Sequence, residues 1–242
     1  MKYKLVFSYD GSKYFGYAIQ KNEEHTIQSV VETAISTILN TPTKISASGR
    51  TDKGVHALNQ VITFISLKKL DKDKFLHSLN KLVPNDIHFK TITKVKDDFD
   101  ARLSAKSKIY EYHINIGEYD VFKRSYEIVV KNLDIKKMHA CAKLFCGTHC
   151  FKNFTSRPND EMGFIRTIYS IKFSLKENIL IIEFKGNGFM TYMVRKLVGA
   201  LISVGQNKAS IDEIKNYLDK AERDIFSLTA APNALFLRKV NY

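Results

Sequence analysis

The sequence predicts an α+β fold in which two ferredoxin-like βαββαβ halves form an extended mixed or antiparallel sheet, with a central cleft and helices on one face. The chain has 242 residues, enough for one large domain or two small ones. Short apolar segments with strand-like alternation are interleaved with apolar patterns of helical period. The order of these elements in the first part of the chain is repeated in the second, which is the basis of the two-half prediction.

The first half, predicted over residues 1–100, contains four strands and two helices. The first strand ends at the turn signal Asp10-Gly11. Thr26 is a suitable N-cap for the first helix, and Pro84 ends the second. The predicted strands cover residues 3–9, 44–48, 60–67 and 87–95, and the predicted helices cover 27–38 and 75–82.

The second half, predicted over residues 105–242, repeats this order with one helix added. Gly147 stops its first helix. A capping box formed by Ser210 and Glu213 begins its last helix. The predicted strands cover residues 109–116, 167–175, 179–184 and 235–240, and the second and third of them are expected to form a hairpin. The two other helices cover 138–145 and 189–204.

Charge and cysteine content narrow the class of protein. Lys and Arg number 38 against 25 Asp and Glu, a net charge of +13, and the pI is about 9.5. Clustered cations gain by displacing counterions from phosphates, so a nucleic-acid partner is favoured over a merely lysine-rich surface. Three cysteines argue against a disulfide scaffold and for a reducing compartment. The longest apolar run, residues 197–204, is too short to cross a bilayer, and no secretory signal is visible, so we expect a cytoplasmic protein.

Residues 47–57 form the segment with the most specific chemistry. They join two predicted strands, and two glycines allow the backbone to bend there. Asp52 lies between the cations Arg50 and Lys53 and next to the hydroxyl of Thr51, neighbours that favour the ionised carboxylate. An ionised carboxylate that is held in place can act as a nucleophile or a base. An Asx-turn with solvated charges explains the same residues equally well.

The resemblance of this loop to a known family favours the chemical interpretation. Residues 47–57, followed by Gln60-Val61, resemble the signature loop of the TruA family of tRNA pseudouridine synthases. Seven further segments resemble family segments in the same order, so the resemblance spans nearly the whole chain. The departures include Tyr17, where the family usually has Trp, and Ala18 in place of Gln. The seven segments are residues 9–17, 99–105, 110–112, 147–151, 166–168, 188–199 and 229–242.

The resemblance implies an enzyme that isomerises uridine to pseudouridine in the anticodon stem-loop of tRNA, at positions 38–40, without cofactor or metal. Asp52 matches the catalytic carboxylate and Arg195 the arginine that pairs with it. Tyr110 matches the tyrosine that stacks on the target base, and Arg50 the residue that helps to hold the flipped nucleotide. The family also implies a homodimer that binds tRNA. The lack of a long apolar run predicts that the protein does not associate with a membrane.

Structural interpretations remain open for several of these residues. Tyr110 alternates with apolar residues and could be a core tyrosine, and Arg195 could be a surface arginine. Thr51 and His56 are expected to support the loop. The candidate phosphate contacts Arg102, Lys106 and Lys108 could equally form a solvated face. Cys141, Cys146, His149 and Cys150 lack metal-ligand spacing, which favours buried thiols over a metal site.

Three other functions have to be weighed against the synthase. A related enzyme redirected to another RNA would have the same sequence features. A non-catalytic RNA-binding module would be expected to carry an RNP1-type aromatic motif, which the sequence lacks. A zinc nucleobase deaminase requires an H-x-E and a P-C-x-x-C segment, and neither is present.

Overall fold

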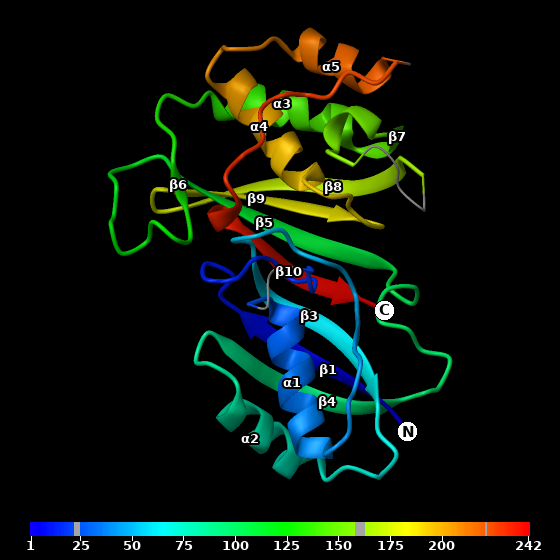
Figure 1. Ribbon diagram of the computed structural model, residues 1–242. Coiled ribbons are helices and arrows are strands. Elements are labelled where there is room, and N and C mark those ends of the chain that lie inside the picture. Colours follow the sequence, from blue (N-terminus) through cyan, green and yellow to red (C-terminus); the bar gives the residue numbers. More distant parts are fainter. Residues whose placement is uncertain (22–24, 158–162, 221) are drawn as a thin grey trace. The chain divides into compact units, whose positions relative to one another are not determined.

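The α+β class is confirmed by the structure, a computed structural model that describes residues 1–21, 25–157, 163–220 and 222–242 (Figure 1). These residues form five α-helices and ten strands. They fall into two compact units. The first unit comprises Met1–Lys106 and Phe236–Tyr242, and the second comprises Ser107–Leu235.

The first unit has the ferredoxin-like strand order. Strand β1 pairs antiparallel with both β3 and β4, and β2 pairs antiparallel with β3. The late strand β10 pairs parallel with β3, through Phe236 opposite His56 and Leu237 opposite Ala57. The sheet of this unit therefore runs β4-β1-β3, with β2 and β10 both paired to β3. The elements are β1 (Lys2–Tyr9), α1 (Ile27–Leu39), β2 (Ser46–Ala47), β3 (His56–Ile65), α2 (Lys72–Leu82), β4 (Ile87–Val95) and β10 (Leu235–Asn241).

Helices α1 and α2 cover one face of this sheet (Figure 1). Buried and half-buried residues alternate along β1, as its period of two requires. Phe64 of β3 stacks between Tyr3 of β1 and Phe75 of α2, with ring centroids 5.7 and 5.6 Å away. Large aromatic side chains thus pack helix α2 against the sheet.

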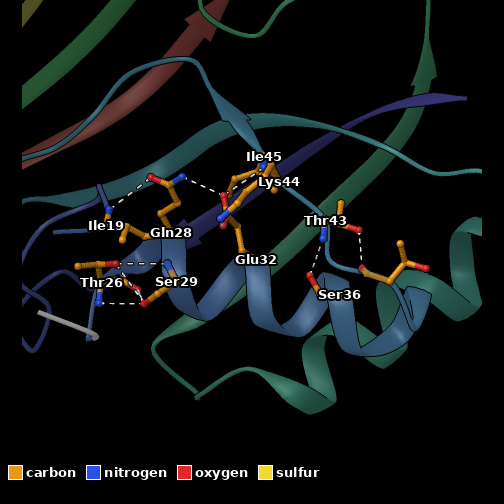
Figure 2. Close-up of polar contacts among 10 residues, drawn as sticks. Ile19, Thr26, Gln28, Ser29, Glu32, Ser36, Thr43, Lys44 and Ile45 are labelled. Carbon is orange, nitrogen blue, oxygen red and sulfur yellow. Dashed lines mark hydrogen bonds and ion pairs between the residues drawn. The ribbon is translucent and has the colours of Figure 1, made fainter. Parts of the chain in front are cut away.

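A buried carboxylate on α1 fixes the segment that leads into β2 (Figure 2). Glu32 is only 7% exposed, and its oxygens accept hydrogen bonds from the Gln28 side chain, the Ile45 backbone N–H and the Lys44 ammonium group. The three donors lie at 2.9, 3.2 and 3.0 Å. Strand β2 begins at Ser46, so this cluster holds one end of the segment that carries Asp52.

The second unit has a four-stranded antiparallel sheet in the order β5-β9-β8-β7. Strands β8 and β9 form the predicted hairpin. The short strands β6, which pairs parallel with β5, and β7 were not predicted. The elements are β5 (Ser107–Asn115), β6 (Ile128–Val129), α3 (Ile135–Phe145), β7 (Gly147–Cys150), β8 (Ile165–Lys176), β9 (Ile179–Gly186), α4 (Met193–Gly205) and α5 (Ile211–Asp219).

Helix α4 begins four residues later than its apolar pattern predicts. The predicted start at residue 189 is wrong, because Tyr192 has the left-handed backbone angle φ of 62° and cannot continue a right-handed helix. The ring of Phe189 packs closely on Gly186, since a Cβ added to Gly186 would lie 3.0 Å from this ring. With 13 residues, α4 is the most apolar helix of the second unit, and no helix in the described residues is long and apolar enough to cross a membrane.

We expect Glu32→Ala to lower the free energy of unfolding by about 1–3 kcal/mol, because it leaves the Ile45 N–H and the Gln28 amide without their acceptor. Urea denaturation would measure the change. The matched control is Lys44→Ala, which removes only a side chain that is 86% exposed. An exposed ion pair contributes about 0–1 kcal/mol, so the control should lose much less stability. Equal losses for the two variants would contradict this account.

Candidate active site

The backbone around Asp52 forms a tight turn. The Val55 N–H donates to the Asp52 carbonyl at 3.1 Å, and Gly54, at the third position, has φ of 79°. A positive φ at this position is the requirement of a type II turn, which favours glycine. Asp52 is half-buried, and Thr51 before it is buried. The turn therefore directs the chain back into β3 while Asp52 stays near the surface.

The segment after β1 supports this turn from behind. The Tyr17 N–H donates to the Thr51 carbonyl at 3.0 Å. Gly16 has φ of 93°, and a Cβ there would lie 3.1 to 3.3 Å from backbone atoms of residues 51–53. A Cβ on Gly11 would lie 2.1 Å from the Val55 carbonyl oxygen. Both glycines are needed for close approach of two backbones, which gives a physical reason for this opening motif.

Buried side chains of β1 and β3 complete the support. The Tyr9 hydroxyl lies 2.8 Å from the Thr51 hydroxyl, and burial raises the pKa of Tyr9 well above its usual range, so it stays a neutral hydroxyl. Gln60 is fully buried. Its side-chain oxygen Oε1 accepts a hydrogen bond from the Ser48 hydroxyl at 2.7 Å, and its side-chain nitrogen Nε2 donates to the Gly49 carbonyl at 3.0 Å. The start and the middle of the loop are thus bonded to side chains of the sheet.

His56 also supports the loop, as expected. It is buried at the start of β3, and its ring stacks on Phe236 with centroids 4.7 Å apart. Its Nδ1 accepts the Gly11 N–H at 3.1 Å and lies 3.1 Å from an oxygen of Asp10. A histidine held on both sides in this way fixes the exit of the loop, a supporting role like that of Thr51.

The two cations beside Asp52 have different surroundings. The Lys53 ammonium lies over the ring of Phe15, 4.0 Å from its centroid, in a cation–π contact. Arg50 is exposed. Burial raises the pKa of the nearby Tyr17 well above its usual range, and the charge of Arg50 opposes this shift only in part. Two predicted site residues, Arg50 and Asp52, lie in this one loop of the first unit.

Tyr110 and Arg195 belong to the second unit. Tyr110 lies on β5 opposite Phe184, is 7% exposed, and meets the ring of Phe189 edge to face with centroids 5.3 Å apart. The core interpretation of Tyr110 therefore holds, and its proposed contact with a base stays a prediction. The pairing of Asp52 with Arg195 also stays a prediction.

Arg195 lies in the first turn of α4 and is held by its surroundings. Its Nε donates to the Ala230 carbonyl at 2.7 Å, and its guanidinium lies over the Tyr192 ring, 4.7 Å from the centroid. It is half-buried, unlike an ordinary surface arginine. The helix N-terminus carries a partial positive charge, and the first turn holds no acidic residue, so this region attracts anions.

The remaining predicted residues are distributed over both units. Arg102 and Lys106 are exposed in the first unit, and Lys108 is half-buried on β5 of the second. Cys141 is buried, which confirms the expected buried thiol there, and this burial raises the pKa of the thiol to about 12. Cys146 is half-buried and Cys150 is exposed, so the expectation of a buried thiol is wrong for Cys150, which lies at the end of the short strand β7. The described residues contain no cluster of metal ligands.

Sequence reasoning missed several residues that hold the loop. Tyr9, Gln60 and Ser48 appeared only as parts of strands or of the resemblance. One signal was available for Gln60, a polar residue within the apolar run of β3, because a buried polar side chain must find hydrogen-bond partners. Nothing in the sequence pattern indicated that Tyr9 bonds Thr51, 42 positions later.

Comparison with known proteins identifies the class. The family model described as tRNA pseudouridine synthase matches residues 5–103 and 141–242. The chain is 39% identical to tRNA pseudouridine synthase A of Listeria monocytogenes, with 100% of this chain and 99% of that protein covered. It is 39% identical to the protein of the same name from a Geobacillus species, covering 99% and 97%, and 37% identical to tRNA pseudouridine synthase A 2 of Bacillus cereus, covering 99% of each.

The chain belongs to the tRNA pseudouridine synthase family. The resemblance drawn from the sequence is thereby confirmed, and with it the prediction of an isomerase that converts uridine to pseudouridine in tRNA.

A pair of tyrosine variants tests the support of the loop. Tyr9→Phe removes the partner of the Thr51 hydroxyl and should lower the free energy of unfolding by about 1 kcal/mol. The hydroxyl of Tyr17 is buried and has no hydrogen-bond partner among the described residues. Tyr17→Phe should therefore leave stability unchanged or raise it, because an unbonded buried hydroxyl costs free energy. Thermal unfolding of both variants measures the difference; a larger loss for Tyr17→Phe would refute the assignment.

Proposed function

We propose that this tRNA pseudouridine synthase uses Asp52 as its catalytic carboxylate and needs neither cofactor nor metal. The observation that carries the proposal is the rigid support of the loop. The backbone of Thr51 is bonded to Tyr17 and packed on Gly16, while Asp52 itself remains half-exposed. A carboxylate with a fixed backbone and access to solvent can meet a substrate in one geometry, as nucleophilic or base catalysis requires.

The reaction needs no imported atom or electron. The bond from uracil N1 to ribose C1′ breaks, the base turns, and a bond forms between uracil C5 and C1′. The hydrogen on C5 leaves as a proton, and N1 gains one. Asp52 could attack C1′, attack uracil C6, or remove a ribose proton, and each course keeps this balance.

The other site residues have substrate-binding roles in this proposal. Tyr110 stacks on the target uracil, a contact that contributes about 1–3 kcal/mol. Arg195 supplies positive charge at the reacting nucleotide, and Arg50 helps to hold that nucleotide out of its helix. Flipping a nucleotide costs a few kcal/mol, which a cation touching phosphate can offset. Arg102, Lys106 and Lys108 contact the RNA backbone.

The proposed substrate is the anticodon stem-loop, with modification at the uridines of positions 38–40, and the proposed functional form is a cytoplasmic homodimer. The family resemblance supports the substrate and the homodimer, and the net charge of +13 supports an RNA partner. One alternative is an enzyme of the same chemistry directed to another RNA. A second is a non-catalytic RNA-binding protein, which would bind tRNA without exchanging the C5 hydrogen.

Loss of the carboxylate charge tests the catalytic proposal. Asp52→Asn should abolish the release of tritium from tRNA labelled at uridine C5, because an amide is neither a nucleophile nor a base. Binding of tRNA, measured by filter retention, should change less than about twofold, because Asp52 contributes to the transition state more than to the ground state. The matched control is Asp98→Asn, at an exposed aspartate of the same unit, which should keep full activity. Wild-type turnover by Asp52→Asn would exclude this residue as the catalyst.

The salt dependence of binding tests the phosphate contacts. Arg102→Ala and Lys106→Ala should each weaken tRNA binding and reduce the slope of log Kd against log salt by about one, since each lost contact releases one counterion fewer. Titrations at several salt concentrations measure the slope. Lys215→Ala, at an exposed lysine of α5, is the control with an unchanged slope. Unchanged slopes for all three variants would favour the solvated-face interpretation.

A further inference from the structure

A segment after α5 lies beside helix α4 (Figure 1). It both donates a hydrogen bond to the helix and accepts one from it. We call this segment, residues 226–231, the strap. The Ala230 N–H donates to the Arg195 carbonyl at 3.1 Å, and the Arg195 Nε donates to the Ala230 carbonyl at 2.7 Å. One residue of the strap thus holds both the backbone and the guanidinium of Arg195.

Lys196 bonds the strap at a second point. It is 4% exposed, and its ammonium group donates to the Phe226 carbonyl at 2.5 Å. Burial and, to a lesser degree, the charge of Arg195 lower the pKa of Lys196. Burying an ammonium group beside another cation is unfavourable, so this lysine is not explained by packing alone. The bond to the strap is the contact that offsets the cost.

Gly199 provides the third point, one helical turn beyond Arg195. A Cβ at this position would lie 2.6 Å from the Leu228 carbonyl oxygen, so only glycine lets the strap backbone reach the helix. Along the strap, Phe226 contacts Lys196, Leu228 contacts Gly199, and Ala230 contacts Arg195.

Both ends of the strap are also bonded to other elements of the unit. The Asn153 carbonyl accepts the Phe226 N–H at 2.9 Å, and the Asn153 side chain accepts the Asp224 N–H at 2.8 Å. At the other end, the Tyr112 hydroxyl donates to the Ala231 carbonyl at 2.8 Å. The position of the Ala230 carbonyl is consequently determined by several elements together.

We propose that the strap sets the direction of the Arg195 guanidinium, and that Lys196 and Gly199 are positioning residues that hold the strap in its place against α4. This inference rests on the proposed substrate-binding role of Arg195. An arginine side chain has several rotatable bonds, and the bond from Nε to Ala230, with the ring of Tyr192 against the guanidinium face, restricts them. The direction of the two terminal nitrogens then follows from the strap.

Lys196→Met tests the proposal, because it keeps the apolar stem and removes the donor to Phe226. We expect kcat for tritium release to fall about 10- to 100-fold, since a displacement of about 1 Å can have effects of this size, while tRNA affinity changes less than about twofold. In nuclear magnetic resonance spectra, the Arg195 Nε–H signal, identified by its loss in Arg195→Lys, should exchange with solvent at least about tenfold faster. The control is Lys215→Met, which should match the wild type in all three measurements.

Gly199→Ala provides a second route if Lys196→Met does not fold. Alanine favours a helix over glycine, so this variant should fold, yet its methyl group must displace the strap. It should show the same loss of kcat and the same faster exchange. Wild-type kcat and wild-type exchange in either variant would overturn the proposal.

Failure of the proposed function would have a different signature. A wild-type protein that releases no tritium, or an Arg195→Lys variant with full activity, would remove the role of Arg195. The exchange rate of the Nε–H signal would still decide whether Lys196 and Gly199 hold the guanidinium, since that measurement requires no turnover.

Discussion

The contact between the peptide backbones of residues 16–17 and 51–53 is the constraint on which the candidate site depends. The Tyr17 N–H to Thr51 carbonyl bond, together with the missing Cβ of Gly16, lets two segments pack backbone to backbone. Asp52 has only two side-chain torsions, so a fixed backbone limits its carboxylate to a few staggered positions. The hydrogen bonds of the Tyr9 and Gln60 side chains to the same loop help to keep this contact in place. Groups preorganised in this way need little rearrangement when charge develops during a reaction.

The two units hold their charged residues by different means, and the length of each side chain explains the difference. A short aspartate can be placed through its main chain. A long arginine needs contacts along its own length, and Arg195 has them at Nε, from Ala230, and on its flat face, from Tyr192. The strap therefore positions Arg195 through its side chain, whereas the segment that contains Gly16 positions Asp52 through its backbone.

Sequence reasoning recovered the elements with clear periodicity and missed features that depend on distant partners. Strands β1 and β4, the β8–β9 hairpin and the capping box of α5 follow from local pattern, and all are present. The start of α4 was predicted too early, because Phe189 and Met190 continue the apolar helical pattern but pack from a loop. The Asp52 loop was found by its unusual residues, whereas its supports and the strap were not. Hydrogen bonds such as those of Gln60 and Lys196 join residues 11 to 30 positions apart, and no local pattern encodes them.

Strand β10 has a consequence for how the protein emerges from the ribosome. It pairs with β3 and counts with the first unit, although the whole second unit is encoded between them. During vectorial translation, at about 5–20 residues per second, residues 56–57 of β3 remain without this partner for on the order of ten seconds. In that interval an unpaired strand edge is open to intermolecular association. A chaperone that binds the nascent first unit would therefore shield this edge, and an insertion in the second unit, which delays the synthesis of β10, would lengthen the exposure.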